Sequence, residues 1–212
     1  MTAGITFENR ELKLREAAAE RGYHVVHPFD DWDVIHGAAT AAMEILLDKP
    51  DTALIVVPIG GGGLLSGTAL AAKAIKPDVK VFAVEPEQAR DAADTFASRR
   101  LQTLPKSPAT LADGVRAVAV GQRTFEVMVE QSLVDGVVSV SESEIAAATV
   151  TAWERLHIAV EPTGALPLAG WLAGKLPAAS GPTVLVITGG NADLGLVARL
   201  LANAGRQGRD DA

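Results

Sequence analysis

Four consecutive glycines between a strand-like and a helix-like segment constrain the fold of this chain more than any other feature. Residues 53–57 form a continuous apolar run, which is typical of a parallel strand buried on both faces. Residues 60–63 are the glycines, residues 64–75 have the composition of a helix, and residues 79–84 form a second strand-like run. This order predicts a βαβ unit, in which a right-handed crossover joins two parallel strands.

The same alternation continues along the chain. Ser141 and Glu144 have the spacing of a capping box, so they predict the start of another helix. We predict further strands at residues 137–140 and 183–187, a short β-like run at 23–27, and helices at 11–21, 35–48, 87–97, 122–133 and 164–176. The pattern predicts an α/β fold with a mostly parallel sheet and helices on both faces. Ligands of such sheets bind outside the carboxyl ends of the strands, where the glycine loop would lie.

The composition excludes several classes of protein. Of the 212 residues, 48% are apolar and 21% are charged, which is typical of a globular domain with a sizeable core. The net charge of -7 disfavours a protein that binds the nucleic-acid backbone, and no apolar run is long enough to span a membrane. The absence of cysteine excludes disulfides, zinc–cysteine sites, iron–sulfur clusters and thiol nucleophiles. Because the N-terminus lacks the apolar core of a signal peptide, we expect a cytoplasmic protein without nucleic-acid or membrane partners.

The glycine loop is chemically suited to holding an anion. Without Cβ atoms the backbone can turn tightly and expose its N–H groups, and the following helix adds free N–H groups and its positive dipole end. Phosphate suits such a site best. The loop is not a dinucleotide-binding motif, whose third glycine would fall on Leu65 or Ser66, and it is not a P-loop, because Thr68 stands where lysine is required. A tight turn without a ligand is the alternative interpretation.

Several segments, in order along nearly the whole chain, carry a resemblance to a known family. They are His27-Pro28-Phe29-Asp30-Asp31, Val34-Ile35-His36-Gly37, the stretch from Val57 through the glycines to Gly67, Glu85-Pro86, Ala112-Asp113-Gly114-Val115, Trp153-Glu154-Arg155-Leu156, Glu161-Pro162-Thr163-Gly164-Ala165 and Thr188-Gly189-Gly190-Asn191-Ala192-Asp193. Together they resemble fold-type II pyridoxal-phosphate enzymes, and most of all the serine/threonine dehydratases (threonine ammonia-lyases) and serine racemases.

The resemblance implies a tryptophan synthase β-like fold that is truncated, because the chain matches the C-terminal part of such enzymes. Residues 1–35 would be a remnant of the small domain, residues 36–204 the large cofactor-binding domain, and residues 205–212 a disordered tail. A natural fragment, a misplaced start and one half of a split enzyme all remain open as origins of the chain.

The resemblance also implies a set of cofactor-binding residues. They are Gly60, Gly61, Gly62, Gly63, Leu64, Glu161, Thr188 and Gly189. The glycines would hold the phosphate of pyridoxal 5′-phosphate, and the Thr188 hydroxyl would face the pyridine nitrogen. A neutral hydroxyl can donate to an unprotonated nitrogen, which suits elimination from Cβ. The alternatives are that Thr188 is an ordinary strand residue and that Glu161 is an ordinary acid at a helix end.

A divalent cation site is implied by the same resemblance. Glu85, the carbonyl of Ala89 and Asp91 have the spacing of the metal site in serine racemase-like enzymes, and their oxygens suit Mg²⁺ or Ca²⁺. A solvated acidic loop is the alternative interpretation. The four histidines include no His-x-x-x-His pair, so a zinc site has little support.

The catalytic lysine of the family has no counterpart in this sequence. The Schiff-base lysine of fold-type II enzymes lies in a Ser-x-Lys-x-Arg-Gly-Ala context, and none of the seven lysines here does. We therefore assign no catalytic residue and expect the isolated chain to be inactive. The function implied is a lyase that removes water from L-serine or L-threonine and then ammonia, in an enzyme that is a homodimer when intact. The alternatives are a non-catalytic cofactor- or partner-binding fragment and a cysteine synthase-like relative, and dehydratase and racemase activity are not distinguished.

Overall fold

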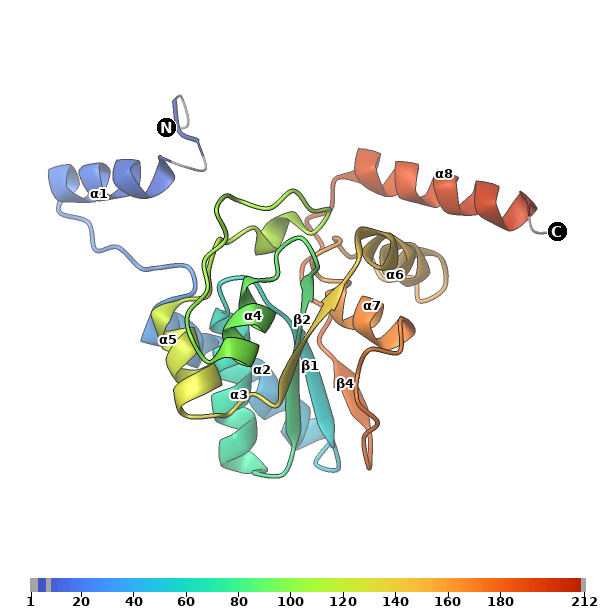
Figure 1. The fold of residues 1–212 in the computed structure, drawn as a ribbon, viewed down its shortest axis with the longest axis horizontal. Coiled ribbons are helices and arrows are strands. Elements are labelled where there is room, and N and C mark those ends of the chain that lie inside the picture. Colours follow the sequence, from blue (N-terminus) through green and yellow to red (C-terminus); the bar gives the residue numbers. More distant parts are fainter. Residues whose placement is uncertain (1–3, 7–8, 211–212) are drawn as a thin grey trace.

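In the computed structural model, which describes residues 4–6 and 9–210, the chain folds around a four-stranded parallel sheet (Figure 1). The strands are β1 (Leu54–Pro58), β2 (Lys80–Pro86), β3 (Gly136–Val140) and β4 (Thr183–Leu185), in the spatial order β3-β2-β1-β4. All three neighbouring pairs are parallel. The predicted α/β fold is confirmed, and so is the βαβ unit around the glycine loop.

The helices lie before, between and after these strands. They are α1 (Arg10–Arg21), α2 (Trp32–Asp48), α3 (Gly63–Ile75), α4 (Asp91–Ser98), α5 (Gln122–Phe125), α6 (Glu142–Glu154), α7 (Leu166–Leu172) and α8 (Leu194–Asp210), with a 3-10 turn η1 (Asp113–Val115) and a π-helical turn η2 (Glu126–Glu130). The predicted capping box starts α6, because the Ser141 hydroxyl accepts from the Glu144 N–H and the Glu144 carboxylate accepts from the Ser141 N–H.

Alternate residues of β1 pack into two separate cores. Ile55 and Val57 belong to a core formed with α2 and α3, whereas Leu54 and Val56 belong to a core formed with α6 and α7. All five residues of β1 are buried. Burial on both faces explains why the sequence of this strand is continuously apolar instead of alternating.

A close approach of α2 and α3 fixes the helix that follows the glycine loop. Gly67 lies in α3, and a Cβ atom at this position would overlap the carbonyl oxygen of Ile35 in α2. The same atom would lie 2.6 Å from the backbone nitrogen of Ala39. Only glycine permits this contact between backbones, so the position of the amino end of α3 is set by packing against α2.

Several predicted element boundaries are wrong, and the β-like run at 23–27 forms no strand. Tyr23, Val25 and Val26 are exposed instead, because no described strand lies beside this segment to pair with it. The first four residues of the helix predicted at 87–97 form a non-helical turn. The helix predicted at 164–176 begins only at Leu166, after a turn over 162–165, and ends at Leu172. The predicted helix at 122–133 changes to π-helical geometry after Phe125.

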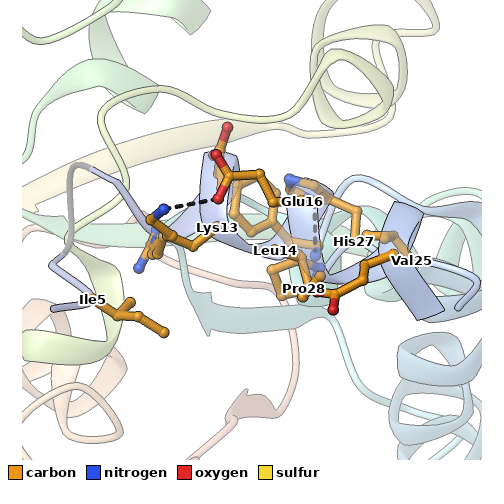
Figure 2. A pocket seen from close by; sticks show the side chains of 12 residues that line it. Ile5, Lys13, Leu14, Glu16, Val25, His27 and Pro28 are labelled. Atoms are coloured by element: carbon orange, nitrogen blue, oxygen red, sulfur yellow. Dashed lines mark hydrogen bonds and ion pairs between the residues drawn. The ribbon is translucent and has the colours of Figure 1, made fainter. Parts of the chain in front are cut away.

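Helix α1 lies apart from the sheet and is joined to α2 by an extended segment (Figure 1). A cavity of about 790 Å³ lies between α1 and residues 25–29, lined by apolar side chains such as Leu14, Val25 and Pro28 (Figure 2). The ion pair between Lys13 and Glu16 lies at the same face, with 2.8 Å between Nζ and Oε2. The predicted domain boundary at residue 35 falls inside α2, and the division of the chain into domains stays a prediction.

The C-terminal segment differs from the prediction of a tail. Helix α8 continues through Asp210, so the helix covers most of the segment 205–212 that we expected to be disordered, and residues 211–212 lie outside the described part. Its apolar side includes the buried Val197. Among the helices that the structure describes, none is both long enough and apolar enough to span a bilayer.

Candidate functional site

The glycine loop connects the carboxyl end of β1 to the amino end of α3. Gly62 is the N-cap residue of α3 and has a φ of 92°, in the left-handed region that glycine adopts at low cost. The N–H groups of the first turn of α3 have no carbonyl partner within the helix, since the first intrahelical bond recorded from this end runs from the Ser66 N–H to the Gly62 carbonyl. The loop therefore combines free N–H donors with the positive end of a 13-residue helix.

Each glycine of the loop is in close contact with another segment. A Cβ atom at Gly60 would lie 2.9 Å from the Cα of Val115, and one at Gly61 would overlap the ring of Phe29. A Cβ atom at Gly62 would overlap the γ-methyl group of Thr124. The loop is thus enclosed by three segments that are distant in sequence, and the lack of side chains at these positions is a steric requirement.

The carbonyl group of Gly61 is held by two hydrogen bonds from one helix start. The backbone N–H of Gly121 and the hydroxyl of Thr124 both donate to the Gly61 oxygen, each at 2.9 Å. The hydroxyl of Ser66, in the first turn of α3, donates in turn to the Thr124 hydroxyl at 3.2 Å. Sequence reasoning missed Thr124, because a threonine about sixty residues from the loop carries no local signal for this contact.

The segment from His27 to Asp30 crosses over the glycine loop and is itself fixed at both ends. The Nδ1 atom of His27 accepts from the Asp30 N–H at 2.9 Å. The Asp30 carboxylate accepts from the backbone N–H of Arg123 at 2.8 Å, and the Arg123 side chain donates to the Asp30 carbonyl at 2.8 Å. These bonds explain why the His-Pro-Phe-Asp sequence, which we noted only for its resemblance, contributes to the site: it places Phe29 against Gly61.

Thr188 lies at the carboxyl end of the sheet, as the glycine loop does. Val56 of β1 pairs with Leu185 of β4, and the Val186 N–H donates to the Val56 carbonyl at 2.9 Å. Three further residues along each strand reach Thr188 on one side and Ile59, next to Gly60, on the other. The structure therefore brings together two glycine-containing turns that lie about 130 residues apart in the sequence.

Glu161 and Gly189 are in direct contact beside Thr188. The Glu161 N–H donates to the Gly189 carbonyl at 3.0 Å, and a Cβ atom at Gly189 would overlap the Glu161 carboxylate. Gly164 is equally restricted, because a Cβ atom there would overlap the carbonyl oxygen of Thr188. The Glu-Pro-Thr-Gly segment thus supports the turn that carries Thr188.

A further hydrogen bond joins this segment to residues 112–115, which contact the glycine loop. The Gly114 N–H donates to the Thr163 hydroxyl at 3.0 Å, and the next residue, Val115, contacts Gly60. Five of the segments singled out from the sequence therefore meet at the carboxyl end of the sheet: those at residues 27–31, 57–67, 112–115, 161–165 and 188–193.

The predicted cation site lies at the carboxyl end of β2. Glu85 is 1% exposed, and its carboxylate accepts from the N–H groups of Ala92 and Ala93 at 3.1 and 2.9 Å, at the start of α4. Asp91 is 4% exposed, and its Oδ2 atom is buried without a hydrogen-bond partner. Ala89, which lies between the two acids in the sequence, is also buried. An unpartnered buried carboxylate oxygen fits a cation, because burying a charge without a partner is costly.

The acidity of the two carboxyl groups reflects this burial. The pKa of Glu85 is raised to about 8, chiefly by burial and in part by the charge of Asp91, although hydrogen bonds from Ala93, Ala92 and Ser139 act in the opposite direction. Burial likewise raises the pKa of Asp91 to about 7, with a contribution from Asp94. Among the described residues no cluster of three or more His, Asp or Glu side chains could hold a metal ion, so the Ala89 carbonyl and water would have to complete the set.

Four of the lysines make hydrogen bonds or ion pairs with other segments. Lys73 and Lys80 both donate to the Asp135 carboxylate at 2.8 Å, and Lys76 donates to the Pro50 carbonyl at 3.1 Å. Asp135 and Pro50 precede strands, so this group lies at the amino end of the sheet, opposite the loop. Lys175 donates to the Glu144 carboxylate at 2.7 Å, beside β3.

Comparison with known proteins identifies relatives over almost the whole chain. Residues 2–189 match the protein family described as "Pyridoxal-phosphate dependent enzyme". The chain is 39% identical to a serine racemase of Oryza sativa subsp. indica over 91% of its own length and 57% of the relative's. It is 41% identical to an L-threonine ammonia-lyase of Geobacter sulfurreducens over 96% of its own length and 51% of the relative's.

Comparison of structures finds the same kind of relatives as comparison of sequences. The structure of maize serine racemase superimposes with a TM-score of 0.84 and 36% sequence identity, covering 97% of this chain and 63% of the other. The chain corresponds to the C-terminal part of these relatives and spans between half and two thirds of their length.

Proposed function

The chain belongs to the family of pyridoxal-phosphate dependent enzymes, and on that basis we propose that it forms the cofactor-binding part of an ammonia-lyase acting on L-serine or L-threonine. The overall reaction removes water across the Cα–Cβ bond of the amino acid and then replaces the nitrogen by oxygen from water, so that a 2-oxo acid and ammonia leave. The observation that carries the proposal is that the glycine loop and the Thr188 turn both lie at the carboxyl end of the sheet.

The glycine loop and α3 fit the phosphate group of the cofactor. Gly60, Gly61, Gly62, Gly63 and Leu64 present backbone to the site, and the positive end of α3 favours a dianion there. Phe29, Val115 and Thr124 close the other side of the loop, so the backbone is held in place before a ligand arrives. A preorganised set of N–H donors loses little entropy on binding.

Thr188 and Glu161 fit the ring end of the cofactor. Pyridoxal phosphate, when bound, withdraws electrons from the Cα atom of an amino acid and so weakens the bonds at that atom. The Thr188 hydroxyl would donate a hydrogen bond to an unprotonated ring nitrogen, whereas a carboxylate would hold that nitrogen protonated. Gly189 and the buried Gly164 hold the turn that presents this hydroxyl.

The buried acids Glu85, at the end of β2, and Asp91, at the start of α4, fit a divalent cation as a second ligand. We propose that Glu85, the carbonyl of Ala89 and Asp91 bind Mg²⁺ or Ca²⁺, completed by water. The unpartnered Oδ2 atom of Asp91 supports this assignment. A cation there would stabilise α4 and β2 and, through the pairing of β2 with β1, the strand that carries the glycine loop.

The positions of the lysines favour a second candidate function for the chain by itself, that of a cofactor-binding fragment without catalysis. Lys73, Lys76 and Lys80 are engaged at the opposite end of the sheet from the glycine loop. A cysteine synthase-like activity has less support, because the relatives with about 40% identity carry the names of serine racemase and threonine ammonia-lyase.

The test of the proposed site is cofactor binding by the 212-residue chain. Equilibrium dialysis with pyridoxal 5′-phosphate should show saturable binding near one equivalent. The Gly62→Asp variant should lose this binding, because a side chain at Gly62 would overlap Thr124 and would not tolerate the φ of 92°, so that the loop would be displaced. Gly37→Asp is the matched control, since a Cβ atom at Gly37, on the exposed side of α2, contacts nothing within 4 Å. Circular dichroism shows whether each variant is folded. Equal binding by the folded Gly62→Asp variant would contradict the proposal.

A further inference from the structure

We propose that Thr124 is a positioning residue of the phosphate loop, whose buried hydroxyl fixes the orientation of the peptide group between Gly61 and Gly62. The inference rests on the proposed phosphate site and adds a residue that lies outside it. Thr124 is 0% exposed and belongs to α5, a helix of four residues followed by the π-helical turn η2. Such local changes in helical geometry are frequent at functional sites.

The geometry of a trans peptide links the Gly61 carbonyl to the Gly62 N–H. The two groups belong to one planar unit and point in opposite directions, and the chain has no cis peptide bond among its described residues. The Gly61 oxygen receives hydrogen bonds from the Thr124 hydroxyl and the Gly121 N–H, both on the side of α5. The Gly62 N–H is therefore directed away from α5 and is left for the anion.

Glycine makes this control necessary. A peptide between two glycines can rotate about its flanking bonds at little steric cost, because both residues tolerate positive φ. Rotation by half a turn would replace the Gly62 N–H by the Gly61 carbonyl, whose partial negative charge repels a phosphate oxygen. The two hydrogen bonds to the Gly61 oxygen stabilise the orientation that attracts phosphate.

The hydroxyl and methyl groups of Thr124 have separable contacts. The hydroxyl donates to Gly61 and accepts from Ser66. The γ-methyl group occupies the space where a Cβ atom of Gly62 would lie. Thr124→Val keeps the methyl group and the branched shape but removes the hydroxyl, whereas Thr124→Ser keeps the hydroxyl and removes the methyl group.

The experiment compares both variants for binding of inorganic phosphate and of pyridoxal 5′-phosphate by equilibrium dialysis. Thr124→Val should weaken both by about threefold to tenfold, the range expected for the loss of one hydrogen bond, while Thr124→Ser stays within about twofold of the wild type. Pyridoxal, which lacks the phosphate, should bind all three proteins alike. Thr149→Val is the matched control, since Thr149 is also 0% exposed and donates to a backbone carbonyl, that of Ile145 in α6.

A second measurement tests the inference without any ligand. Hydrogen exchange of the Gly121 amide, which donates to the Gly61 carbonyl, should be faster in Thr124→Val than in the wild type and unchanged in Thr124→Ser. Unchanged exchange in Thr124→Val, or an equal loss of phosphate affinity in both Thr124 variants, would overturn the inference. A wild-type chain that binds no phosphate would refute the proposed function, and the exchange rates would still decide the role of Thr124.

Discussion

At the scale of single residues, the turn that carries Thr188 depends on the absence of one side chain. Gly164 lies so close to the Thr188 carbonyl that a methyl group could not be accommodated without moving the backbone. Gly164→Ala should therefore lower the free energy of unfolding by about 1 to 3 kcal/mol, the cost of overpacking, and should weaken cofactor binding by displacing Thr188. Urea denaturation and dialysis with pyridoxal 5′-phosphate measure the two effects.

Gly37→Ala is the control for that substitution. It makes the same chemical change at an exposed helical position with no neighbour within 4 Å, and the higher helix propensity of alanine should leave stability equal or raise it by up to about 1 kcal/mol. If Gly164→Ala were as stable as Gly37→Ala, the close contact between Gly164 and Thr188 would be wrong.

Asp135 links three elements at the amino end of the sheet and gives stability a dependence on pH. Burial raises its pKa, but hydrogen bonds from Lys73, Lys80 and the Val81 N–H lower it more, so that the net pKa lies below the ordinary value of 3.8. Because the folded-state pKa is lowered, the contribution to stability is complete above the unfolded-state value. It is lost as pH falls through the lower folded-state value.

We predict that Asp135→Asn lowers the free energy of unfolding at pH 7 by about 1 to 3 kcal/mol, since hydrogen bonds to a charged group are lost. The difference between the variant and the wild type should shrink as pH falls below the ordinary pKa of 3.8. Urea denaturation at a series of pH values measures this difference. A difference that stays constant down to about pH 2 would show that the charge of Asp135 is not responsible.

At the scale of elements, the amino ends of two helices carry the candidate ligand sites. The amino end of α3 holds the glycine loop, and the amino end of α4 is capped by the Glu85 carboxylate from β2. Both helices follow the carboxyl ends of neighbouring parallel strands. The phosphate and cation sites are therefore placed by one βαβ unit and its continuation into α4.

The proposed cation site predicts a change in thermal stability. Mg²⁺ or Ca²⁺ should raise the Tm of the wild-type chain, because a ligand that binds only the folded state stabilises it, by about 2.7 kcal/mol at roughly one hundred times Kd. Asp91→Ala should remove the response, while Asp94→Ala, which changes an exposed acid of the same helix, should retain it. Calorimetric scans with and without the cation measure the effect. An equal response in Asp91→Ala would remove this site from consideration.

At the scale of the whole molecule, the described fold leaves apolar surface exposed on two of its elements. The strand β4 lies at the edge of the sheet and is only half-buried, and Leu12 and Leu14 of α1 are exposed. The relatives contain additional chain that this sequence does not match. Exposed apolar surface on a separate helix and a half-covered strand are the expected places for such additional chain to pack.

The isolated 212-residue chain should not release a 2-oxo acid from L-serine or L-threonine. The reaction needs a lysine that binds the cofactor aldehyde and a base for the α-proton, and their loss removes several orders of magnitude in rate. Lys73 and Lys80 are paired with Asp135 far from the loop, so neither is placed for these roles. A 2-oxo acid assay tests the prediction, together with borohydride reduction and peptide mapping. Sustained product formation with one stoichiometrically modified lysine would contradict it.

Local patterns in the sequence were sufficient to specify several elements of this fold. The continuous apolar run of β1 required burial on both faces, the four glycines required a tight turn at a helix start, and Ser141 with Glu144 required a capped helix. Because parallel strands end at one edge of a sheet, the same patterns also placed the glycine loop and Thr188 at one end.

The distant residues that hold the site in shape are specified by tertiary packing alone. Phe29, Thr124 and Val115 contact the glycine loop from three separate segments, and no spacing in the sequence relates them to it. The apolar run at 23–27 stayed unpaired for the same kind of reason, since a strand forms only where a partner strand supplies its hydrogen bonds. A local sequence pattern specifies an element, whereas long-range contacts specify which elements lie beside it. The orientation of the peptide between Gly61 and Gly62 depends on such long-range contacts.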